Sequence, residues 1–162
     1  FMDDYPRAWF VPTIQTGLSS GEISAYMDNS TLEPRETAFV KDPEGALTQK
    51  IFSVGKVVVL ERSLQHLVLG TENEGSGFLV LSEVFYPEGW FAYLDGETKL
   101  EMYATNELIR GFQIPAGNHE IEFVFDPPAV KAGLRVTVLS FLILLGLAGL
   151  YYYKSRTSAQ VD

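Results

Sequence analysis

The residues best suited to hold a ligand are Glu83, Tyr86, Trp90 and Arg110. Glu83 interrupts the otherwise apolar stretch GFLVLSEVF, and the two aromatic residues follow it closely. A carboxylate beside exposed aromatic rings is a common way to hold a sugar, because rings stack on CH faces while the acid accepts hydroxyl hydrogen bonds. In the alternative, both rings fill the core, and Glu83 caps a backbone amide or pairs with Arg110.

No catalytic template is recognisable elsewhere in the chain. The two histidines, His66 and His119, have no spacing typical of a metal site, and we expect them on half-buried or exposed strand positions. The absence of cysteine excludes disulfides, thiolate metal ligands and a cysteine nucleophile. The stretch GTENEGSG at residues 70–77 lacks the lysine and the following helix of a phosphate-binding loop. We therefore expect no catalytic residue, no cofactor and no metal in this chain.

Charge is distributed unevenly along the sequence. Residues 1–126 contain eight Lys or Arg and twenty Asp or Glu, a net charge of −12, whereas the remainder contains four basic residues and one acidic residue. An acidic surface repels phosphate backbones, so nucleic acid is excluded as an expected partner.

The stretch from Val136 to Tyr153 contains no charged residue. As a helix, it measures about 27 Å, close to the ~30 Å hydrocarbon core of a bilayer. A buried helix of a soluble core is the alternative, but such a helix normally shows a polar face. The sequence therefore predicts a transmembrane helix at residues 134–153 that anchors the chain in a lipid bilayer, after a β-rich domain at residues 1–130 and before a short tail at residues 154–162.

The flanking charges bear on orientation. Lys154 and Arg156 favour a cytoplasmic tail, which places the β-rich domain outside the cytoplasm of a bacterial cell, at its inner (cytoplasmic) membrane. No export signal precedes the domain, so we expect the chain to be the C-terminal part of a longer membrane protein.

Alternating and β-branched patterns dominate the rest of the chain. With turns between the strands, they predict a mainly β fold: an antiparallel, jelly-roll-like β-sandwich with a short N-terminal helix and one C-terminal transmembrane helix. Strands are expected at residues 7–14, 37–40, 57–61, 64–70, 77–85, 90–94, 100–103, 108–114 and 120–125.

Local signals mark the ends of these elements. Ser19 and Glu22 have the spacing of a capping box at the start of a short helix. Asp95-Gly96 predicts a two-residue hairpin turn, and Pro115-Ala116-Gly117-Asn118 predicts a second hairpin. The polar residues 70–77 are expected to form another hairpin loop.

Two longer segments resemble the C-terminal end of the YfhO-like bacterial membrane protein family: SEVFYPEGWFAYLDGE and NELIRGFQIPAGNHEIEFVFDP, followed by a hydrophobic helix. The stretch Pro6 to Val11 is similar to that family's entry into the same domain. Two departures are visible, since Glu88 is inserted in the loop before Trp90 and Thr105 stands where alanine is usual. The matching residues are Ser82, Glu83, Tyr86, Pro87, Gly89, Trp90, Ala92, Tyr93, Asp95, Gly96, Asn106, Arg110, Pro115, Ala116, Gly117, His119 and Phe123.

The resemblance implies a polytopic protein similar to glycosyltransferases that use polyprenyl-phosphate sugars to glycosylate cell-envelope polymers such as lipoteichoic acid. The catalytic carboxylate then lies outside this chain, and the chain is an accessory domain and membrane anchor. Its expected partners are the remaining transmembrane helices of the parent protein and an envelope glycan or polyprenyl-phosphate sugar. The alternative is a membrane-anchored, non-catalytic module that holds carbohydrate or is purely structural.

Overall fold

The computed structural model describes residues 6–28 and 33–158, with side chains up to residue 150, so residues 159–162 of the expected tail lie outside the described residues. The chain divides into two compact units, Phe1–Asp126 and Pro127–Asp162. In the described part of the first unit the elements are β1 (Ala8–Val11), β2 (Thr13–Thr16), α1 (Ser20–Met27), β3 (Thr37–Lys41), β4 (Lys56–Arg62), β5 (His66–Asn73), β6 (Gly77–Val84), β7 (Trp90–Leu94), β8 (Thr98–Leu100), β9 (Tyr103–Thr105), β10 (Ile109–Ile114) and β11 (Gly117–Phe125).

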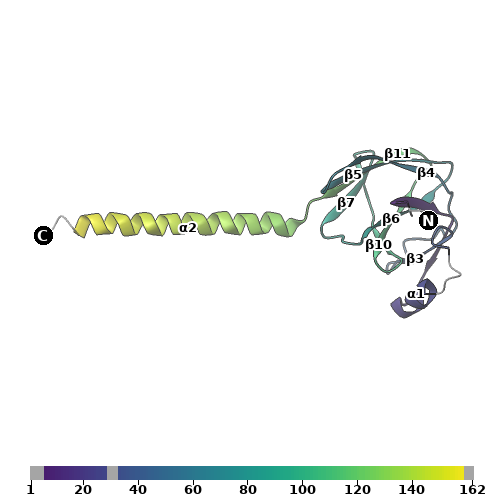
Figure 1. Ribbon diagram of the computed structural model, residues 1–162, viewed down its shortest axis with the longest axis horizontal. Coiled ribbons are helices and arrows are strands. Elements are labelled where there is room, and N and C mark those ends of the chain that lie inside the picture. Colours follow the sequence, from purple (N-terminus) through teal and green to yellow (C-terminus); the bar gives the residue numbers. More distant parts are fainter. Residues whose placement is uncertain (1–5, 29–32, 159–162) are drawn as a thin grey trace, which may run out of the picture. The chain divides into compact units, whose positions relative to one another are not determined.

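These strands form two sheets (Figure 1). One sheet has the order β1-β6-β10-β9-β3-β2, and the other has the order β4-β5-β11-β7-β8. The predicted mainly β sandwich with a short N-terminal helix is thus confirmed. One pairing differs from the expected antiparallel pattern, because β2 and β3 run parallel. Helix α1 lies between them in the chain and provides the crossover that parallel neighbours require.

The six-stranded sheet is curled into a half-barrel. Its two edge strands, β1 and β2, are separated in the chain by Pro12 alone. The Phe52 N–H donates to the Pro12 carbonyl at 2.8 Å, and the Ile14 N–H donates to the Lys50 carbonyl at 3.0 Å, so the segment before β4 extends the edge. The curl encloses a core of its own, made of Trp9, Val11, Ile14, Ala38, Val40, Leu47, Phe52, Phe78, Val80 and Tyr103.

A second core fills the space between the two sheets. Strand β6 contributes to both cores, with Leu79 and Leu81 facing the other sheet and Phe78 and Val80 facing the curl. Both faces of β6 are therefore covered, which accounts for the nearly continuous apolar run of its sequence. Each fully buried large apolar side chain contributes about 1.5–3 kcal/mol. The residues between the sheets are Ala8, Phe10, Leu67, Leu69, Leu79, Leu81, Ala92, Phe112, Ile114, Ile121 and Phe123.

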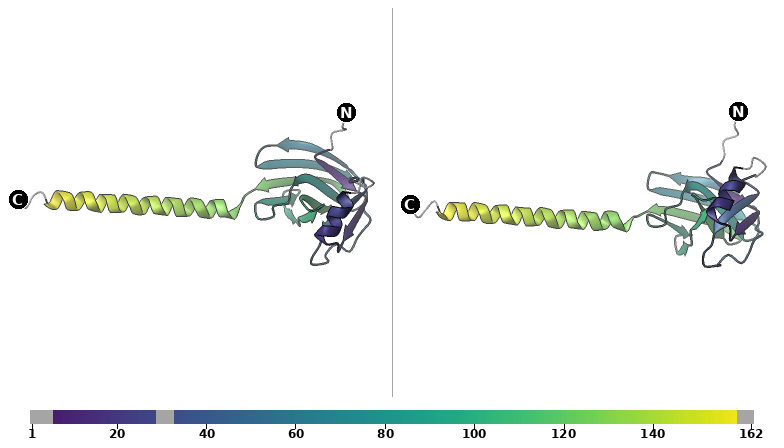
Figure 2. Two further views of the ribbon diagram at one scale, coloured as in Figure 1. Left: turned by 60° about the horizontal axis from the view of Figure 1, so that its bottom comes forward. Right: turned by 90° about the horizontal axis from the view of Figure 1, so that it is seen from below.

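The predicted capping box is confirmed at the start of α1. The Ser19 side chain accepts from the Glu22 backbone N–H, and the Glu22 carboxylate accepts from the Ser19 N–H at 2.8 Å. Ile23 is buried, and the Tyr26 ring stacks on Phe39 of β3 at a centroid distance of 5.3 Å. Two further views show this helix at the margin of the sheets (Figure 2).

The Asp95-Gly96 hairpin is also confirmed. Both residues have positive φ, 51° and 73°, as a two-residue turn between twisted strands requires, and β7 pairs with β8 around them. The Asp95 carboxylate then accepts from the Glu120 N–H at 2.9 Å, which ties this turn to β11.

The other two predicted hairpins are wrong. The chain crosses from one sheet to the other at residues 74–76 and again at Pro115 and Ala116. Strands β5 and β11 belong to one sheet, and β6 and β10 belong to the other. The expected strand at residues 100–103 is likewise divided, with β8 pairing with β7 and β9 pairing with β10. Because each crossing puts consecutive strands in different sheets, their apolar faces pack against each other across the core between the sheets. In a hairpin the two strands would instead lie side by side in one sheet.

The second unit is the helix α2 (Pro128–Ser158), longer at both ends than the expected residues 134–153. Its stretch Pro128–Leu150 is long and apolar enough to cross a membrane, and the most apolar window in it has a mean hydropathy of 2.0 and no buried residue. An apolar helix of this length that buries none of that window suits anchoring in a bilayer. The boundary between the units lies after Asp126, four residues before the expected end of the domain.

Candidate functional site

One end of the sandwich contains a cavity of about 200 Å³ to which both sheets contribute. The six-stranded sheet supplies residues from β6 and β10 and from the start of β1, and the other sheet supplies residues from β4, β5 and β7. The lining consists of Arg7, Arg62, Ser63, Leu64, Leu67, Glu83, Trp90 and Arg110. We call this cavity the arginine pocket. Three of the four ligand-contact candidates from the sequence, Glu83, Trp90 and Arg110, therefore line one cavity.

Strand periodicity explains why these side chains converge. Successive side chains of a strand alternate between faces, so residues two apart share a face. Glu83 follows Leu79 and Leu81 on the face of β6 that points between the sheets, and Arg110 precedes Phe112 on the corresponding face of β10. The polar residues thus continue the rows of core side chains and cover the end of the apolar core.

A β-bulge shapes the site locally. Arg110 pairs with Leu81 but the preceding Ile109 pairs with Val84, which leaves Ser82 and Glu83 without register partners on β10. Bulges turn side chains away from the regular pleat and are frequent beside functional sites. Here the bulge coincides with the carboxylate of the pocket.

Arg110 is buried, with 3 % of its surface exposed. Its Nε donates to the Val84 carbonyl at 2.8 Å, and its guanidinium carbon lies 4.6 Å from the centroid of the Trp90 ring. No hydrogen bond joins its two terminal nitrogens to another described residue, and neither nitrogen is among the fully buried side-chain atoms that lack a partner. Burial lowers the pKa of Arg110, and the charge of Glu83 opposes this shift. The guanidinium stays charged, because arginine is effectively always protonated in proteins.

The other charged groups of the pocket differ in their pairing. Arg7 Nη1 forms an ion pair with Glu83 Oε1, and both side chains are about one-third exposed. Arg62, at the exposed end of β4, has no carboxylate within ion-pair distance in the described part of the chain. The lining therefore holds three guanidinium groups and one carboxylate, a local charge near +2 in a domain whose net charge is −12.

The aromatic candidates occupy different positions. The Trp90 ring contacts Arg110 and also packs on Phe125 at a centroid distance of 5.2 Å, so ring contacts within the protein occupy it. Tyr86 is 43 % exposed, does not line the arginine pocket, and contacts Phe125 at 6.4 Å. In this geometry Trp90 positions Arg110, and Tyr86 lies beyond the cavity.

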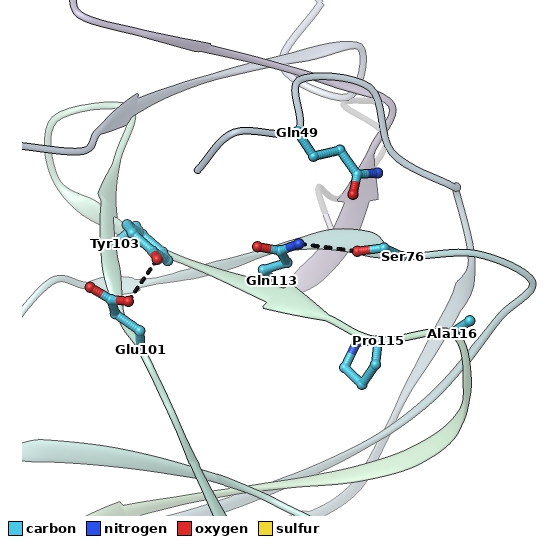
Figure 3. Close-up of a pocket in the computed structure, with 7 residues that line it drawn as sticks. All are labelled: Gln49, Ser76, Glu101, Tyr103, Gln113, Pro115 and Ala116. Atoms are coloured by element: carbon cyan, nitrogen blue, oxygen red, sulfur yellow. Dashed lines mark hydrogen bonds between the residues drawn. The ribbon is translucent and has the colours of Figure 1, made fainter. Parts of the chain in front are cut away.

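A larger and more open cavity, of about 580 Å³, lies where the chain crosses from β10 to β11 (Figure 3). Its polar side chains largely satisfy one another. The Tyr103 hydroxyl donates to Glu101 at 2.8 Å, and Gln113 donates to Ser76 at 3.3 Å. Burial, and then the Glu101 carboxylate, raise the pKa of Tyr103, so this hydroxyl remains protonated. This cavity offers amide, hydroxyl and carboxylate groups but no cation in its lining.

Both histidines form hydrogen bonds with carboxylates. His66 Nε2 lies 2.8 Å from Glu122, and His119 Nδ1 lies 2.7 Å from Asp95. These hydrogen bonds raise the pKa of each imidazole, while partial burial opposes the shift. In the described residues, no group of three His, Asp or Glu side chains is arranged to hold a metal ion.

Arg7 and Arg62 were absent from the sequence-based candidates. They precede β1 and end β4, far in sequence from the 83–110 region, and no local motif connects them to it. The stronger sequence signal lay in Arg110 itself, a charge within the apolar run LIRGFQI that the fold buries. Comparison of the chain with protein-family models, with curated proteins and with solved structures finds no match in any of the three.

Proposed function

We propose that this chain is the accessory domain and membrane anchor of a bacterial, polytopic cell-envelope glycosyltransferase-like protein of the YfhO-like type, one that uses polyprenyl-phosphate sugars. The catalytic residues lie outside the chain. The domain faces the outside of the cytoplasmic membrane, and the tail after α2 faces the cytoplasm. Within this assembly the domain holds a ligand for a reaction that the rest of the protein carries out.

The convergence in the arginine pocket is the observation that supports this proposal most. Arg7 comes from the first segment that resembles the family, and Glu83, Trp90 and Arg110 come from the later segments. Four positions from separate parts of the resemblance thus line one cavity. An apolar helix suited to membrane anchoring follows two residues after β11, which agrees with a domain that works on a membrane-bound ligand.

The size of the pocket limits what it can hold. Cavities for whole small molecules usually measure about 300–1,000 Å³, and the arginine pocket measures about 200 Å³. It therefore suits one charged or polar group of a larger ligand. The rest of such a ligand would lie outside the cavity.

The first test is genetic. In the source organism, the reading frame upstream of the Phe1 codon should encode several hydrophobic spans. Deletion of the whole gene should remove a sugar substituent from an envelope polymer, and the intact gene should restore it. An unchanged glycan profile in the deletion strain would overturn the proposal.

Topology provides a second test, which the absence of cysteine makes simple. Single-cysteine variants Thr98→Cys and Ser155→Cys would be treated in intact cells with a membrane-impermeant maleimide. We expect labelling at position 98 and none at position 155 until the membrane is permeabilised. The opposite pattern would contradict the proposed orientation.

The cavity in Figure 3 favours one alternative, a membrane-anchored carbohydrate-binding module without a catalytic parent. Its volume lies in the range of small-molecule sites, and Gln49, Gln113 and Glu101 are side chains that bind sugar hydroxyls. Chemical-shift changes of the two glutamine amides on addition of an envelope oligosaccharide, together with a reading frame that lacks further hydrophobic spans, would favour the alternative.

A further inference from the structure

We propose that the arginine pocket is a binding site for a phosphate monoester, in which the buried Arg110 and the exposed Arg62 both contact the phosphate. The inference deepens the proposed function by naming the ligand class, and it rests on that function for the source of the phosphate. Transfer of a sugar from a polyprenyl-phosphate donor breaks the bond between the sugar and the phosphate, and it leaves a lipid that ends in a phosphate monoester.

The first argument is the incomplete pairing of Arg110. Among the described residues, Arg110 has one hydrogen bond, from Nε, and no carboxylate lies within ion-pair distance. Its terminal nitrogens are not among the fully buried atoms that lack a partner. Since Arg110 lines the cavity, these donors are accessible to a ligand there. A planar guanidinium with free donors is the side-chain group best matched to the paired oxygens of a phosphate.

The second argument is charge. Residues 1–126 contain eight basic residues, and three of them line this one small cavity. With Glu83 included, the lining carries a charge near +2. A phosphate monoester carries about −1.5 to −2 at pH 7, which balances this charge, whereas a carboxylate carries −1 and would leave one guanidinium unmatched.

The third argument concerns Arg7 and Glu83. Their ion pair closes one side of the cavity and withdraws one of the three cations from the ligand. Glu83 is thus an internal anion that competes with the phosphate for Arg7. Glu83 would therefore oppose ligand binding, whereas a sugar contact would favour it. The two roles predict opposite effects of Glu83→Gln on ligand affinity.

Packing alone does not account for these groups. The contact with Trp90 explains how the Arg110 side chain is held, but the two terminal nitrogens have no hydrogen-bond partner in the part of the chain that the structure describes. It also gives no role to Arg62, which stands at the pocket without a carboxylate partner among the described residues. A bound oxyanion satisfies both observations.

The experiment uses the full chain in phosphatidylcholine nanodiscs and titrates it with inorganic phosphate at fixed ionic strength, read by calorimetry. Arg62→Gln is compared with Lys56→Gln, which removes the same charge from an exposed position on the same strand, β4. We expect Arg62→Gln to weaken binding about threefold to fivefold, the scale of an exposed ion pair, and Lys56→Gln to change it less than twofold. Equal effects of the two variants, or no saturable binding at millimolar phosphate, would overturn the inference.

Two further variants test the geometry. Arg110→Lys keeps the positive charge but loses the paired N–H donors of the planar guanidinium. We expect this variant to bind phosphate at least about tenfold more weakly, as for a lost hydrogen bond to a charged group. Circular dichroism checks that this variant is folded. Glu83→Gln frees Arg7, so phosphate should bind severalfold more tightly. Weaker binding by Glu83→Gln would overturn the phosphate site and favour a sugar contact.

A second experiment distinguishes a lipid-linked phosphate from a soluble one. Nanodiscs that contain polyprenyl monophosphate are compared with nanodiscs of phosphatidylcholine alone in the inorganic phosphate titration. Competition by the lipid would identify a lipid-linked ligand, and its absence would identify a soluble phosphate, with the site supported in both cases. If phosphate binds but gene deletion leaves the envelope glycans unchanged, the proposed function is wrong and the phosphate site stands. If gene deletion changes the glycans but phosphate does not bind, the phosphate site is wrong and the proposed function stands.

Discussion

Asn106 and Phe39 exchange two hydrogen bonds across the six-stranded sheet. The Asn106 N–H donates to the Phe39 carbonyl at 2.7 Å, and the Asn106 side-chain oxygen accepts from the Phe39 N–H at 2.9 Å. Asn106 has a φ of 47°, a left-handed conformation that asparagine tolerates better than most residues. Its side chain therefore replaces a strand partner at a point where β9 has ended.

Replacement of Asn106 by alanine should lower the free energy of unfolding by about 2–4 kcal/mol. The buried Phe39 N–H loses its acceptor, which costs about 1–3 kcal/mol, and alanine at positive φ adds about 1 kcal/mol of strain. Urea unfolding of the chain in detergent, followed by tryptophan fluorescence, measures the change. Asn118→Ala, at an exposed position, is the matched control and should change stability by less than about 0.5 kcal/mol.

Arg110→Met should change the free energy of unfolding by less than about 1 kcal/mol despite complete burial of the site. The variant loses the contact with Trp90, worth about 0.5–2 kcal/mol, and the hydrogen bond to the Val84 carbonyl. Removal of a buried charge that has no carboxylate partner among the described residues offsets both losses. Phe112→Ala on the same strand is the comparison, with an expected loss of about 3–5 kcal/mol. Similar losses in both variants would show that Arg110 is a structural residue.

The stability of the domain should decrease as pH rises above about 6.5, the unperturbed value for histidine. The hydrogen bond to Glu122 raises the pKa of His66, and the one to Asp95 raises the pKa of His119. A raised folded-state pKa gives stabilisation that is complete below the unfolded value and is lost as pH rises through the folded value. The urea midpoint of unfolding, measured at several pH values above about 6.5, gives the dependence of stability on pH. NMR titration of the two imidazoles shows which histidine causes it. The double variant His66→Gln/His119→Gln should remove the slope; an unchanged slope would contradict this origin.

Gly111→Ala should destabilise the domain by about 1–3 kcal/mol, the usual effect of overpacking a core. A Cβ at this position of β10 would clash with the Thr105 hydroxyl and lie 2.6 Å from the Phe78 ring. Gly21→Ala in α1 is the control, because a Cβ there has no neighbour within 4 Å. Alanine is the better helix former, so the control should be neutral or more stable by up to about 1 kcal/mol. Thermal melts of both variants provide the comparison.

Leu142→Arg should release the chain from membranes. A central arginine disfavours insertion by about 2.5–3.5 kcal/mol. This is comparable with the summed favourable term of about −3 to −6 kcal/mol, at roughly −0.3 to −0.6 kcal/mol for each of the ten Leu, Ile, Val and Phe residues between Val136 and Tyr153. Leu134→Arg, near the start of α2, should have little effect, because its side chain can extend to the interface. The fraction that resists carbonate extraction distinguishes the two. Equal retention of both variants would argue against a spanning helix.

Short-range features of the fold could be predicted from the sequence. Ser19 with Glu22 and Asp95 with Gly96 each act through neighbouring backbone groups, and each pair has the predicted consequence in the structure. The crossings after β5 and β10 could not be predicted in this way. Their turn residues satisfy the local backbone equally well in a hairpin or in a crossing, and burial against distant strands decides between the two.

The same limit applies to the arginine pocket. Glu83, Trp90 and Arg110 lie on strands whose alternation places them on inward faces, so their convergence follows once the sheets are known. Arg7 reaches Glu83 only because β1 pairs with β6, and Arg62 reaches the cavity only because β4 pairs with β5. These pairings join residues that no short-range rule connects.

The position of β1 has a consequence for biosynthesis. Ala8 pairs with Leu81 on β6, 73 residues later in the chain. At about 5–20 residues per second, the ribosome delivers that partner roughly 4–15 s after β1 itself. An unpaired apolar strand exposed for seconds is an aggregation hazard. A chaperone or translocon that shields the nascent N-terminal strand would therefore improve the yield of this domain more than any stabilising substitution late in the chain.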